Sequence, residues 1–302
     1  MVKSILLTGH TGFLGSVIYK ELKKSFEVIT LGRDNSCDYR VDFSCWDGTL
    51  DLKQTIDAIV HVAGLAHNKA KNQKELFDVN TTSVKHLVAI AKKNNVESLI
   101  YISSTAVYGK TYGLDITENT SLLGKSDFSI TKIEAERVIE SCNLDNRLIL
   151  RLPLVVGPKP PGNLGRLSSS ISSGSHIYLS GNLAQKSVVF ASDVASFISH
   201  WLSESKKESG TIHLCNQAAP TFNGIENAIA ESGGFRYRFR IPIKLLWKTV
   251  NWTKATLNIS IPLVGKLFYP LTFSDQFARE KFGYTSKLLN QTTFTNELNS
   301  ID

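Results

Sequence analysis

Three glycines near the start of the chain have a spacing that could hold phosphate groups. Gly9, Gly12 and Gly15 recur at intervals of three, after an apolar run and at the start of a helical pattern. Glycine permits a tight turn and lets a phosphate approach the backbone, while the first turn of a helix offers unpaired N–H groups. The pattern therefore predicts a site for the pyrophosphate of a dinucleotide. The residues expected to bind this cofactor at the turn are Gly9, Thr11, Gly12, Phe13, Leu14 and Gly15.

The adenosine end of such a dinucleotide is expected beside the second strand. An acidic residue usually follows that strand and binds the ribose. Here Leu31 is followed by Gly32, Arg33 and Asp34. Arg33 could pair with a 2′-phosphate, which favours NADP, or it could be a solvated loop charge, and both interpretations stay open. Asp42 is a candidate for a hydrogen bond to the adenine.

The elements that must position these residues follow a regular alternation. From Lys3 to about Pro153, short β-branched runs alternate with longer helical patterns, which is typical of βαβ units in a parallel sheet. We expect buried strands at 5–7, 28–31, 58–62, 99–102 and 148–150, and helices at 13–24, 79–94 and 126–142. The pattern predicts an α/β fold with a Rossmann-type doubly wound parallel sheet over residues 1–161.

The composition of the chain changes after Pro158, where stretches rich in glycine, proline and serine begin. We expect a smaller C-terminal substrate lobe over residues 162–302, with the segment 187–200 returning to the larger domain. Residues 241–273 are apolar and aromatic but contain Lys244, Lys248, Lys254 and Lys266, so they lack the roughly 20 uncharged residues that a bilayer span needs. This segment is predicted to be either lobe core or an amphipathic surface.

The overall composition excludes several classes of protein. The chain has 302 residues, is 42% hydrophobic and 20% charged, and carries a formal charge of +7. Disorder, collagen and coiled coil are therefore excluded, and partners with negative charge are mildly favoured. Cys37, Cys45, Cys142 and Cys215 have neither disulfide-framework nor zinc-ligand spacing, so no metal is expected. The chain begins without a leader pattern, which predicts a cytoplasmic protein.

Several motifs stand in a recognisable order along the chain. They are 8–15 (TGHTGFLG), 57–64 (DAIVHVAG), 78–80 (DVN), 101–109 (YISSTAVYG), 151–158 (RLPLVVGP), 186–195 (KSVVFASDVA) and 278–284 (AREKFGY). In this order they resemble the extended short-chain dehydrogenase/reductases, specifically the NAD-dependent nucleotide-sugar epimerase/dehydratase family. The resemblance covers nearly the whole length and implies a nucleotide-sugar substrate and NAD or NADP as cofactor.

The resemblance also implies roles for individual residues. Ser104 corresponds to the family's catalytic serine or threonine, and Lys132 to the lysine that hydrogen-bonds the nicotinamide ribose. Further implied contacts are with the cofactor at Ala63, Asn80 and Pro153, and with the substrate at Asn163, Leu164 and Arg166. Family members commonly form a homodimer through the two helices that precede and carry the lysine. Within the family, the chain looks most like enzymes that act on UDP-N-acetylhexosamine-type sugars for surface polysaccharides.

One catalytic position departs from the family pattern. A family tyrosine stands four residues before the lysine, on the same face of the helix, and the lysine's charge lowers the pKa of the phenol. Here Phe128 occupies that position. Because general acid–base assistance contributes about 10²–10⁴-fold in rate, the usual mechanism should be impaired. The alternatives are an enzyme with another acid–base group and a catalytically impaired sensor or scaffold that binds NAD(P).

A replacement acid–base group has several candidates, each of which also has an ordinary structural interpretation. The candidates are Tyr108, Tyr112, Ser104, Asp127 and His67. Tyr108 is expected to pack in a turn, Asp127 to lie at a helix start, and His67 to cap a loop. The structural interpretation is favoured for each, and only Ser104 has a catalytic role by resemblance.

Aromatic residues and arginines alternate from Phe235 to Arg240. In a strand this period of two would place the arginines on one face. We expect an edge strand first, a grip on the substrate diphosphate, with Arg240 in contact, second, and nucleic-acid binding last. Neither nucleic acid nor a membrane is an expected partner.

Overall fold

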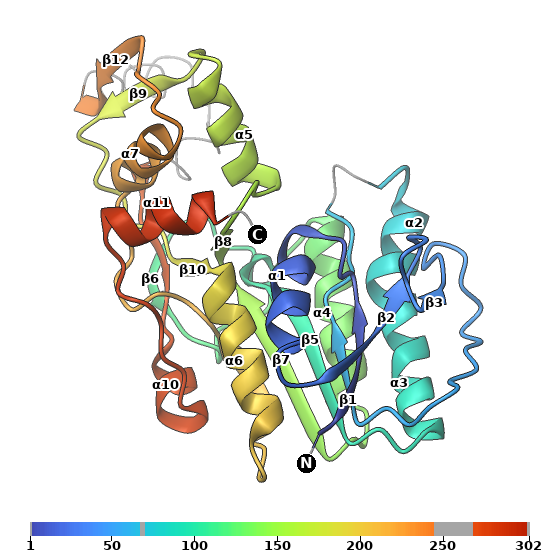
Figure 1. Ribbon diagram of the computed structural model, residues 1–302. Coiled ribbons are helices and arrows are strands. Elements are labelled where there is room, and N and C mark those ends of the chain that lie inside the picture. The colour runs from blue at the N-terminus through green and yellow to red at the C-terminus, as the bar shows by residue number, and fades with distance from the viewer. Residues whose placement is uncertain (1, 67–69, 245–267, 301–302) are drawn as a thin grey trace.

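The computed structural model describes residues 2–66, 70–244 and 268–300, and within them a parallel sheet of seven strands forms the centre. Its order is β11-β7-β5-β4-β1-β2-β3 (Figure 1). The bounds are β1 Ser4–Thr8, β2 Glu27–Gly32, β3 Tyr39–Arg40, β4 Ala58–His61, β5 Ser98–Ser104, β7 Asn146–Leu152 and β11 Gly210–His213. The strand order reverses direction between β1 and β4, where doubly wound sheets bind ligands. The predicted α/β fold of Rossmann type is confirmed.

Helices cover both faces of this sheet (Figure 1). On one face, α1 (Phe13–Leu22) and α6 (Ala191–Ser203) share a core with the strands. On the other, α3 (Ser83–Lys93) and α4 (Asp127–Glu140) do the same. Because helices cover both faces of the central strands, β1 and β4 are buried along their whole length, which explains the unbroken apolar runs in the sequence.

The helix predicted over 79–94 is not regular. The short helix α2 (Gln73–Phe77) runs into one turn of π-helix, Asp78–Thr82, and only then into α3. The extra residue in a π turn rotates the side chains that follow it, and such turns are frequent at functional sites. The turn holds Asn80, which is 1% exposed.

The smaller lobe lies at the upper left of Figure 1. It contains an apolar core of its own. Its helices are α5 (Gly162–Ser172), α7 (Phe222–Ser232) and α11 (Gln291–Asn299). Two short sheets belong to it: β8 (Leu154–Val156) pairs with β10 (Val188–Phe190), and β9 (Ile177–Ser180) pairs with β12 (Phe239–Pro242). A third sheet pairs β6 (Gly113–Ile116), which follows a 3₁₀ turn at Thr105–Tyr108, with β13 (Leu271–Phe273) before α10 (Gln276–Phe282).

The chain passes repeatedly between the two lobes. Besides α6, strand β11 joins the edge of the main sheet beside β7, and Ala278, Phe282 and Tyr284 pack into the core under α6. The returning segment therefore extends past the predicted 187–200. The division at residue 161 stays a prediction.

Two further expectations concern the later part of the chain. The strand expected over 235–240 is wrong in its bounds, because only Phe239 and Arg240 of that stretch lie in β12. Glycines 233 and 234, just before it, favour a turn, so the pairing with β9 begins only at Phe239. Residues 245–267 of the apolar stretch lie outside the described residues. No described helix is both long and apolar enough to cross a membrane.

Candidate functional site

The glycine turn joins β1 to α1 and leaves the start of that helix open. Gly9 has a φ of +75°, and a Cβ there would lie 2.7 Å from the amide nitrogen of Ala63, just after β4. A Cβ on Gly15 would lie 1.9 Å from the Gly9 carbonyl oxygen. Gly12 is the N-cap, so no side chain caps the helix, and its first turn has no acidic residue. The N–H groups of this turn are available to an anion, which fits a pyrophosphate.

Thr8 fixes the turn to the neighbouring strand. Its Oγ1 accepts hydrogen bonds from the N–H groups of Val62 and Ala63, both at 3.1 Å. The same atom lies 2.7 Å from Nδ1 of His61, to which it can donate its hydrogen. Burial, together with the charge of Lys132, lowers the pKa of His61 to about 3, so this ring stays neutral at physiological pH.

Asn80 ties the loop after β4 to α4. Its Oδ1 accepts from the N–H of Leu65 at 2.7 Å, and its Nδ2 donates to the carbonyl of Leu65 at 3.0 Å and to Thr131 Oγ1 at 3.2 Å. A Cβ on Gly64 would lie 3.3 Å from Asn80 Oδ1. The amide is thus engaged within the protein, and the predicted contact of Asn80 with the cofactor stays a prediction.

Lys132 projects from α4 towards the same loop. It is 6% exposed, and its Nζ donates to the carbonyl of Ile102 at 2.8 Å and lies 4.6 Å from the centre of the Tyr101 ring. A Cβ on Gly64 would lie 3.5 Å from this Nζ. Burial lowers the pKa of Lys132 to about 8, so it is mostly charged at neutral pH. A buried cation therefore stands beside the loop that carries Ala63 and Gly64.

The two predicted catalytic positions near Lys132 differ in what they can do. Phe128 lies one turn before Lys132 on α4, half-buried, and has no proton to exchange. Ser104 ends β5, and its Oγ accepts from the N–H of Ala106 at 3.2 Å as the cap of the 3₁₀ turn. Its hydroxyl hydrogen is not used in that contact, so Ser104 can donate to an oxygen of a bound molecule.

A buried carboxylate joins the strand of Ser104 to the helix of Lys132. Glu136 lies one turn after Lys132 and is 1% exposed. The hydroxyl of Ser103 donates to it, and Arg151 binds both of its oxygens at 2.7–3.2 Å. Ser103 directly precedes Ser104, and Glu136 lies one turn after Lys132. Their contact therefore sets Ser104 and Lys132 relative to each other.

Tyr108 is bonded to the same arginine as Glu136. By the cleft we mean the glycine turn, the loop at residues 63–64 and the residues around Ser104 and Lys132. The hydroxyl of Tyr108 accepts from Arg151 Nη1 at 2.9 Å and lies 2.5 Å from His213 Nε2. His213 Nδ1 lies 3.0 Å from the carbonyl of Ser274, which can only accept, so Nδ1 carries the hydrogen and Tyr108 donates to Nε2. Burial raises the pKa of Tyr108 to about 12 and lowers that of His213 to about 4. These contacts favour the structural interpretation of Tyr108.

The remaining candidates for the acid–base role lie in ordinary surroundings. Asp127 opens α4 and accepts a hydrogen bond from Gln73 Nε2 at 3.1 Å. Tyr112 is 63% exposed, with its ring 5.9 Å from that of Tyr269. His67 lies outside the described residues.

The expected adenosine end carries carboxylates that are engaged by their own loops. Asp34 accepts from the N–H and hydroxyl of Ser36, and Asp42 from those of Ser44, at 2.7–2.9 Å. These hydrogen bonds lower the pKa of both carboxyl groups. Arg33 is exposed and, in the described part of the chain, makes no hydrogen bond or salt bridge. Both interpretations of Arg33 remain compatible with this geometry.

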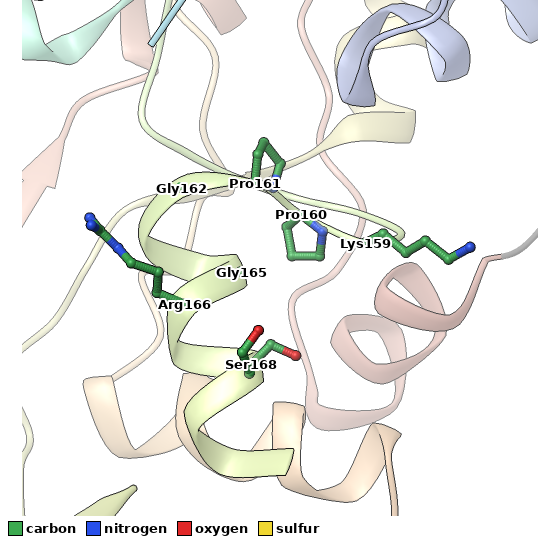
Figure 2. A pocket seen from close by; sticks show the side chains of 8 residues that line it. Lys159, Pro160, Pro161, Gly162, Gly165, Arg166 and Ser168 are labelled. Carbon is green, nitrogen blue, oxygen red and sulfur yellow. The ribbon is translucent and has the colours of Figure 1, made fainter. Parts of the chain in front are cut away.

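Three of the predicted substrate residues, Asn163, Leu164 and Arg166, lie at the start of α5, and of these only Arg166 lines a pocket. A pocket of about 560 Å³ lies there, lined by Lys159, Pro160, Pro161, Gly162, Gly165, Arg166, Ser168 and Ser169 (Figure 2). Figure 2 shows the side chains of Lys159 and Arg166 extending to opposite sides of the helix start. Both Asn163 and Arg166 are exposed to solvent. Arg166 Nη2 donates a hydrogen bond to Asn163 Oδ1 at 2.6 Å.

Three other predicted contacts need correction or restriction. Leu164 is 1% exposed in the core of the small lobe, so its side chain cannot contact a substrate. Leu14 is likewise in the core below α1, and only its backbone N–H can face a phosphate. Arg240 stacks 5.7 Å from the rings of Tyr178 and Tyr237, and no contact in the described chain joins it to the α5 pocket. Pro153, between β7 and β8, is half-buried.

Sequence reasoning missed the residues that brace the site. Thr8, His61, Ser103 and Glu136 each make buried hydrogen bonds to partners distant in the chain. The only sequence signal for Glu136 is its place four residues after Lys132 on the same helix. Nothing local singles out Thr8 or His61.

The fold and the cleft define an α/β protein with a doubly wound parallel sheet and an open helix start at its reversal point. The model of the family described as "NAD dependent epimerase/dehydratase family" matches residues 5–215. The chain belongs to that family. This agrees with the resemblance and with the expected cofactor class.

Two curated relatives match part of the chain. The UDP-glucose 4-epimerase of Vibrio cholerae is 30% identical over 192 residues, which cover 58% of each protein. The N-acetyl-alpha-D-glucosaminyl-diphospho-ditrans,octacis-undecaprenol 4-epimerase of Escherichia coli O157:H7 is 23% identical over 211 residues, 67% of this chain and 64% of the relative. The chain thus spans less than two thirds of the length of either relative.

Solved structures match the fold over almost the whole chain. MoeE5 in complex with UDP-glucose and NAD has a TM-score of 0.75 at 19% identity, covering 98% of this chain and 97% of that one. The UDP-glucuronic acid 4-epimerase of Bacillus cereus in complex with NAD has a TM-score of 0.75 at 16% identity with the same coverage. These similarities show the fold, including the small lobe.

Proposed function

We propose that this protein is an NAD(P)-dependent oxidoreductase that epimerises, dehydrates or reduces a nucleotide-activated sugar, with UDP-hexosamine-type sugars as the first class to test. The observation that carries this proposal is the uncapped start of α1 beside the loop 63–64, with the buried ammonium of Lys132 against the same loop. An open helix start attracts a pyrophosphate. A cation beside the neighbouring loop suits contact with a ribose or with a developing oxyanion. The family and the UDP-sugar relatives support the same activity.

The residues of the cleft divide the binding of the cofactor among them. The amides of residues 13–15 would hold the pyrophosphate, Lys132 the nicotinamide ribose, and Arg33 or Asp42 the adenosine end. Ala63 and Pro153 would line the path between them. A bound nicotinamide dinucleotide would supply the group that accepts and returns a hydride.

Removal of the proton from the sugar hydroxyl is the step for which this protein lacks the usual group. Ser104 would donate a hydrogen bond to the sugar oxygen, and the charge of Lys132 would favour the ionised form of that oxygen. Phe128 cannot take the proton. Turnover is therefore expected to be slow unless another group takes it.

A second candidate function follows from the phenylalanine at position 128. An intact glycine turn and an engaged Lys132 beside Phe128 fit a protein that binds dinucleotide and sugar nucleotide without converting them. Such a protein would act as a sensor or a scaffold. The two candidates share the cofactor and differ in chemistry.

Restoring the phenol tests which candidate holds. We expect Phe128→Tyr to raise turnover of UDP-N-acetylglucosamine at least about tenfold, because the variant regains a general acid–base group beside Lys132. Product formation would be followed by NMR, and NAD and NADP binding by calorimetry. Phe26→Tyr, at a half-buried site outside the cleft, is the matched control and should change nothing.

The outcomes separate the candidates. Unchanged turnover with cofactor still bound favours the sensor, or another base. If neither NAD nor NADP binds the wild-type protein, both candidates are rejected.

Four other expectations belong to the same proposal. A homodimer through α3 and α4 and a role in surface polysaccharide synthesis follow from the resemblance. The division into a dinucleotide domain and a substrate lobe near residue 161 follows from the change in composition after Pro158, and the cytoplasmic location from the lack of a leader pattern. Light scattering of the purified protein would test the dimer directly.

A further inference from the structure

The positive charge of the chain is concentrated in two segments without acidic residues. Residues 152–192 and 232–274 contain ten lysines and arginines and no aspartate or glutamate. The rest of the chain has 24 basic and 27 acidic residues. The whole net charge of +7 therefore comes from these two segments. In the described structure they supply α5, β9 and β12 of the small lobe.

The strands β9 and β12 bring the two segments together at the end of the small lobe away from the main sheet (Figure 1). Their first register pair is Ile177 with Phe239, and these side chains are 47% and 59% exposed. Paired residues in parallel strands point to the same side of a sheet, so the two apolar groups form one exposed patch. Phe235, 37% exposed, lies in the turn before β12.

Three arginines are close to this patch in the sequence. Arg236 and Arg238 precede Phe239, are exposed, and make no hydrogen bond or ion pair in the described part of the chain. Arg240 lies on the opposite face of β12, where its guanidinium stacks 5.7 Å from the Tyr178 and Tyr237 rings. Stacking holds the guanidinium flat and leaves its N–H groups for other partners. We call Ile177, Phe235, Arg236, Phe239 and their neighbouring Arg238 and Arg240 the lobe tip.

We propose that the lobe tip docks on an anionic lipid bilayer. Basic side chains are attracted to acidic headgroups, and exposed aromatic and aliphatic side chains next to them enter the interface between headgroups and acyl chains. The lobe tip has both, and the two segments that form it contain no carboxylate; the acidic residues near Tyr237 are Glu226 and Glu231 of α7. This is peripheral binding, and it differs from our expectation of no membrane partner, which rested on the lack of a spanning segment.

The same surface suits nucleic acid less well. Binding to single strands depends on aromatic rings free to stack on bases. Here Tyr178 and Tyr237 stack on each other at 4.4 Å and are covered by Arg240. The exposed partner of Phe239 is the aliphatic Ile177, which adds to burial in lipid but not to base stacking.

Vesicle flotation of the full-length protein tests the proposal. We expect the protein to float with vesicles of phosphatidylcholine and phosphatidylglycerol, and to stay in solution with phosphatidylcholine alone. Flotation should weaken as salt increases, since salt screens surface charges. Failure to float with the acidic vesicles, or equal flotation with both compositions, overturns the proposal.

Variants assign the binding to the lobe tip. Replacing Arg236, Arg238 and Arg240 by glutamine should reduce binding to the acidic vesicles at least about tenfold. The matched control replaces Lys53, Lys206 and Lys281 by glutamine; these lysines are also exposed and lie outside the lobe tip and the proposed dimer helices, and the variant should leave binding within about twofold. An equal loss in both triple variants means that net charge alone attracts the vesicles, and this overturns the proposal.

A second variant keeps the charge and removes the apolar patch. Ile177→Ser with Phe239→Ser should also release the protein from vesicles, and thermal melting checks that each variant is folded. Tight binding of a single-stranded oligonucleotide that the arginine variant loses, without flotation, identifies a nucleic-acid surface and overturns the proposal. None of these measurements depends on cofactor or turnover, so the proposed function and this inference fail separately.

Discussion

The dinucleotide cleft and the small lobe hold their polar residues in opposite ways. In the cleft, Thr8, Asn80 and Glu136 are buried and bonded to partners far along the chain. At the start of α5, Arg166 and Asn163 are exposed and bond to each other across one helical turn. A buried polar group without its partner is destabilising by about 1–3 kcal/mol, whereas an exposed one bonds to water. The cleft therefore tolerates few residue types at each position, and the pocket on α5 tolerates many.

The largest effect should come from the ion pair that braces the cleft. Arg151→Met leaves the carboxylate of Glu136 buried without a counter-charge, and should lower the free energy of unfolding by about 3–5 kcal/mol. Urea titration measures this change. The double variant Glu136→Leu, Arg151→Met should recover most of the loss, because well-packed apolar residues can replace a buried pair. If the double variant is no more stable than the single one, the pair itself is the stabilising feature.

Alanine in place of glycine compares the two regions directly. Gly15→Ala places a methyl group 1.9 Å from the Gly9 carbonyl and should cost about 3 kcal/mol, with loss of dinucleotide binding. Gly162→Ala is the matched control, since its φ is +68° but nothing lies within 4 Å of the added Cβ. It should cost only about 1 kcal/mol of backbone strain. Melting curves would compare the stability of the two variants, and calorimetry would compare their binding of NAD. Equal losses of stability in both variants would contradict the contrast between the cleft and the small lobe.

The buried Lys132 gives the cleft a distinctive pH dependence. Its pKa is lowered to about 8 in the folded protein, from 10.5. Between these values the unfolded chain binds more protons, so the free energy of unfolding should rise with pH, by up to about 3 kcal/mol. Lys132→Met removes this rise, while wild-type dinucleotide affinity should fall above pH 8 as the ammonium loses its proton. Unfolding curves of the wild type and of Lys132→Met from pH 7 to 10 measure this difference. If the free energy of unfolding depends on pH in the same way in both proteins, Lys132 is not buried.

The smallest effect is expected on the surface of α5. Arg166→Gln removes one exposed hydrogen bond to Asn163 and should change the free energy of unfolding by less than about 0.5 kcal/mol. If the proposed substrate site is correct, the KM for a UDP-sugar should rise while stability stays constant. A large loss of stability would mean that the small lobe is built like the cleft.

The sequence predicted best those features that depend on local pattern. The strands were recognisable because both faces of the sheet are covered, and the turn at Gly9 because glycine is required there. The contact of Ser103 with Glu136 joins residues 33 apart on different elements, and such pairs leave no periodicity in the sequence. The bounds of β12 failed for a related reason, since pairing with β9 and not alternation decides where that strand begins.

The repeated passage of the chain between the lobes limits how the protein can be divided. A fragment ending at residue 161 would retain β1, β4, β5 and β7 but lose α6, β11 and the core residues around Phe282. One apolar face of its sheet would then meet water, and its outer strand β7 would have an unpaired edge. Such a fragment should aggregate, so a single cut at the apparent boundary is not expected to give the larger lobe as an independent unit.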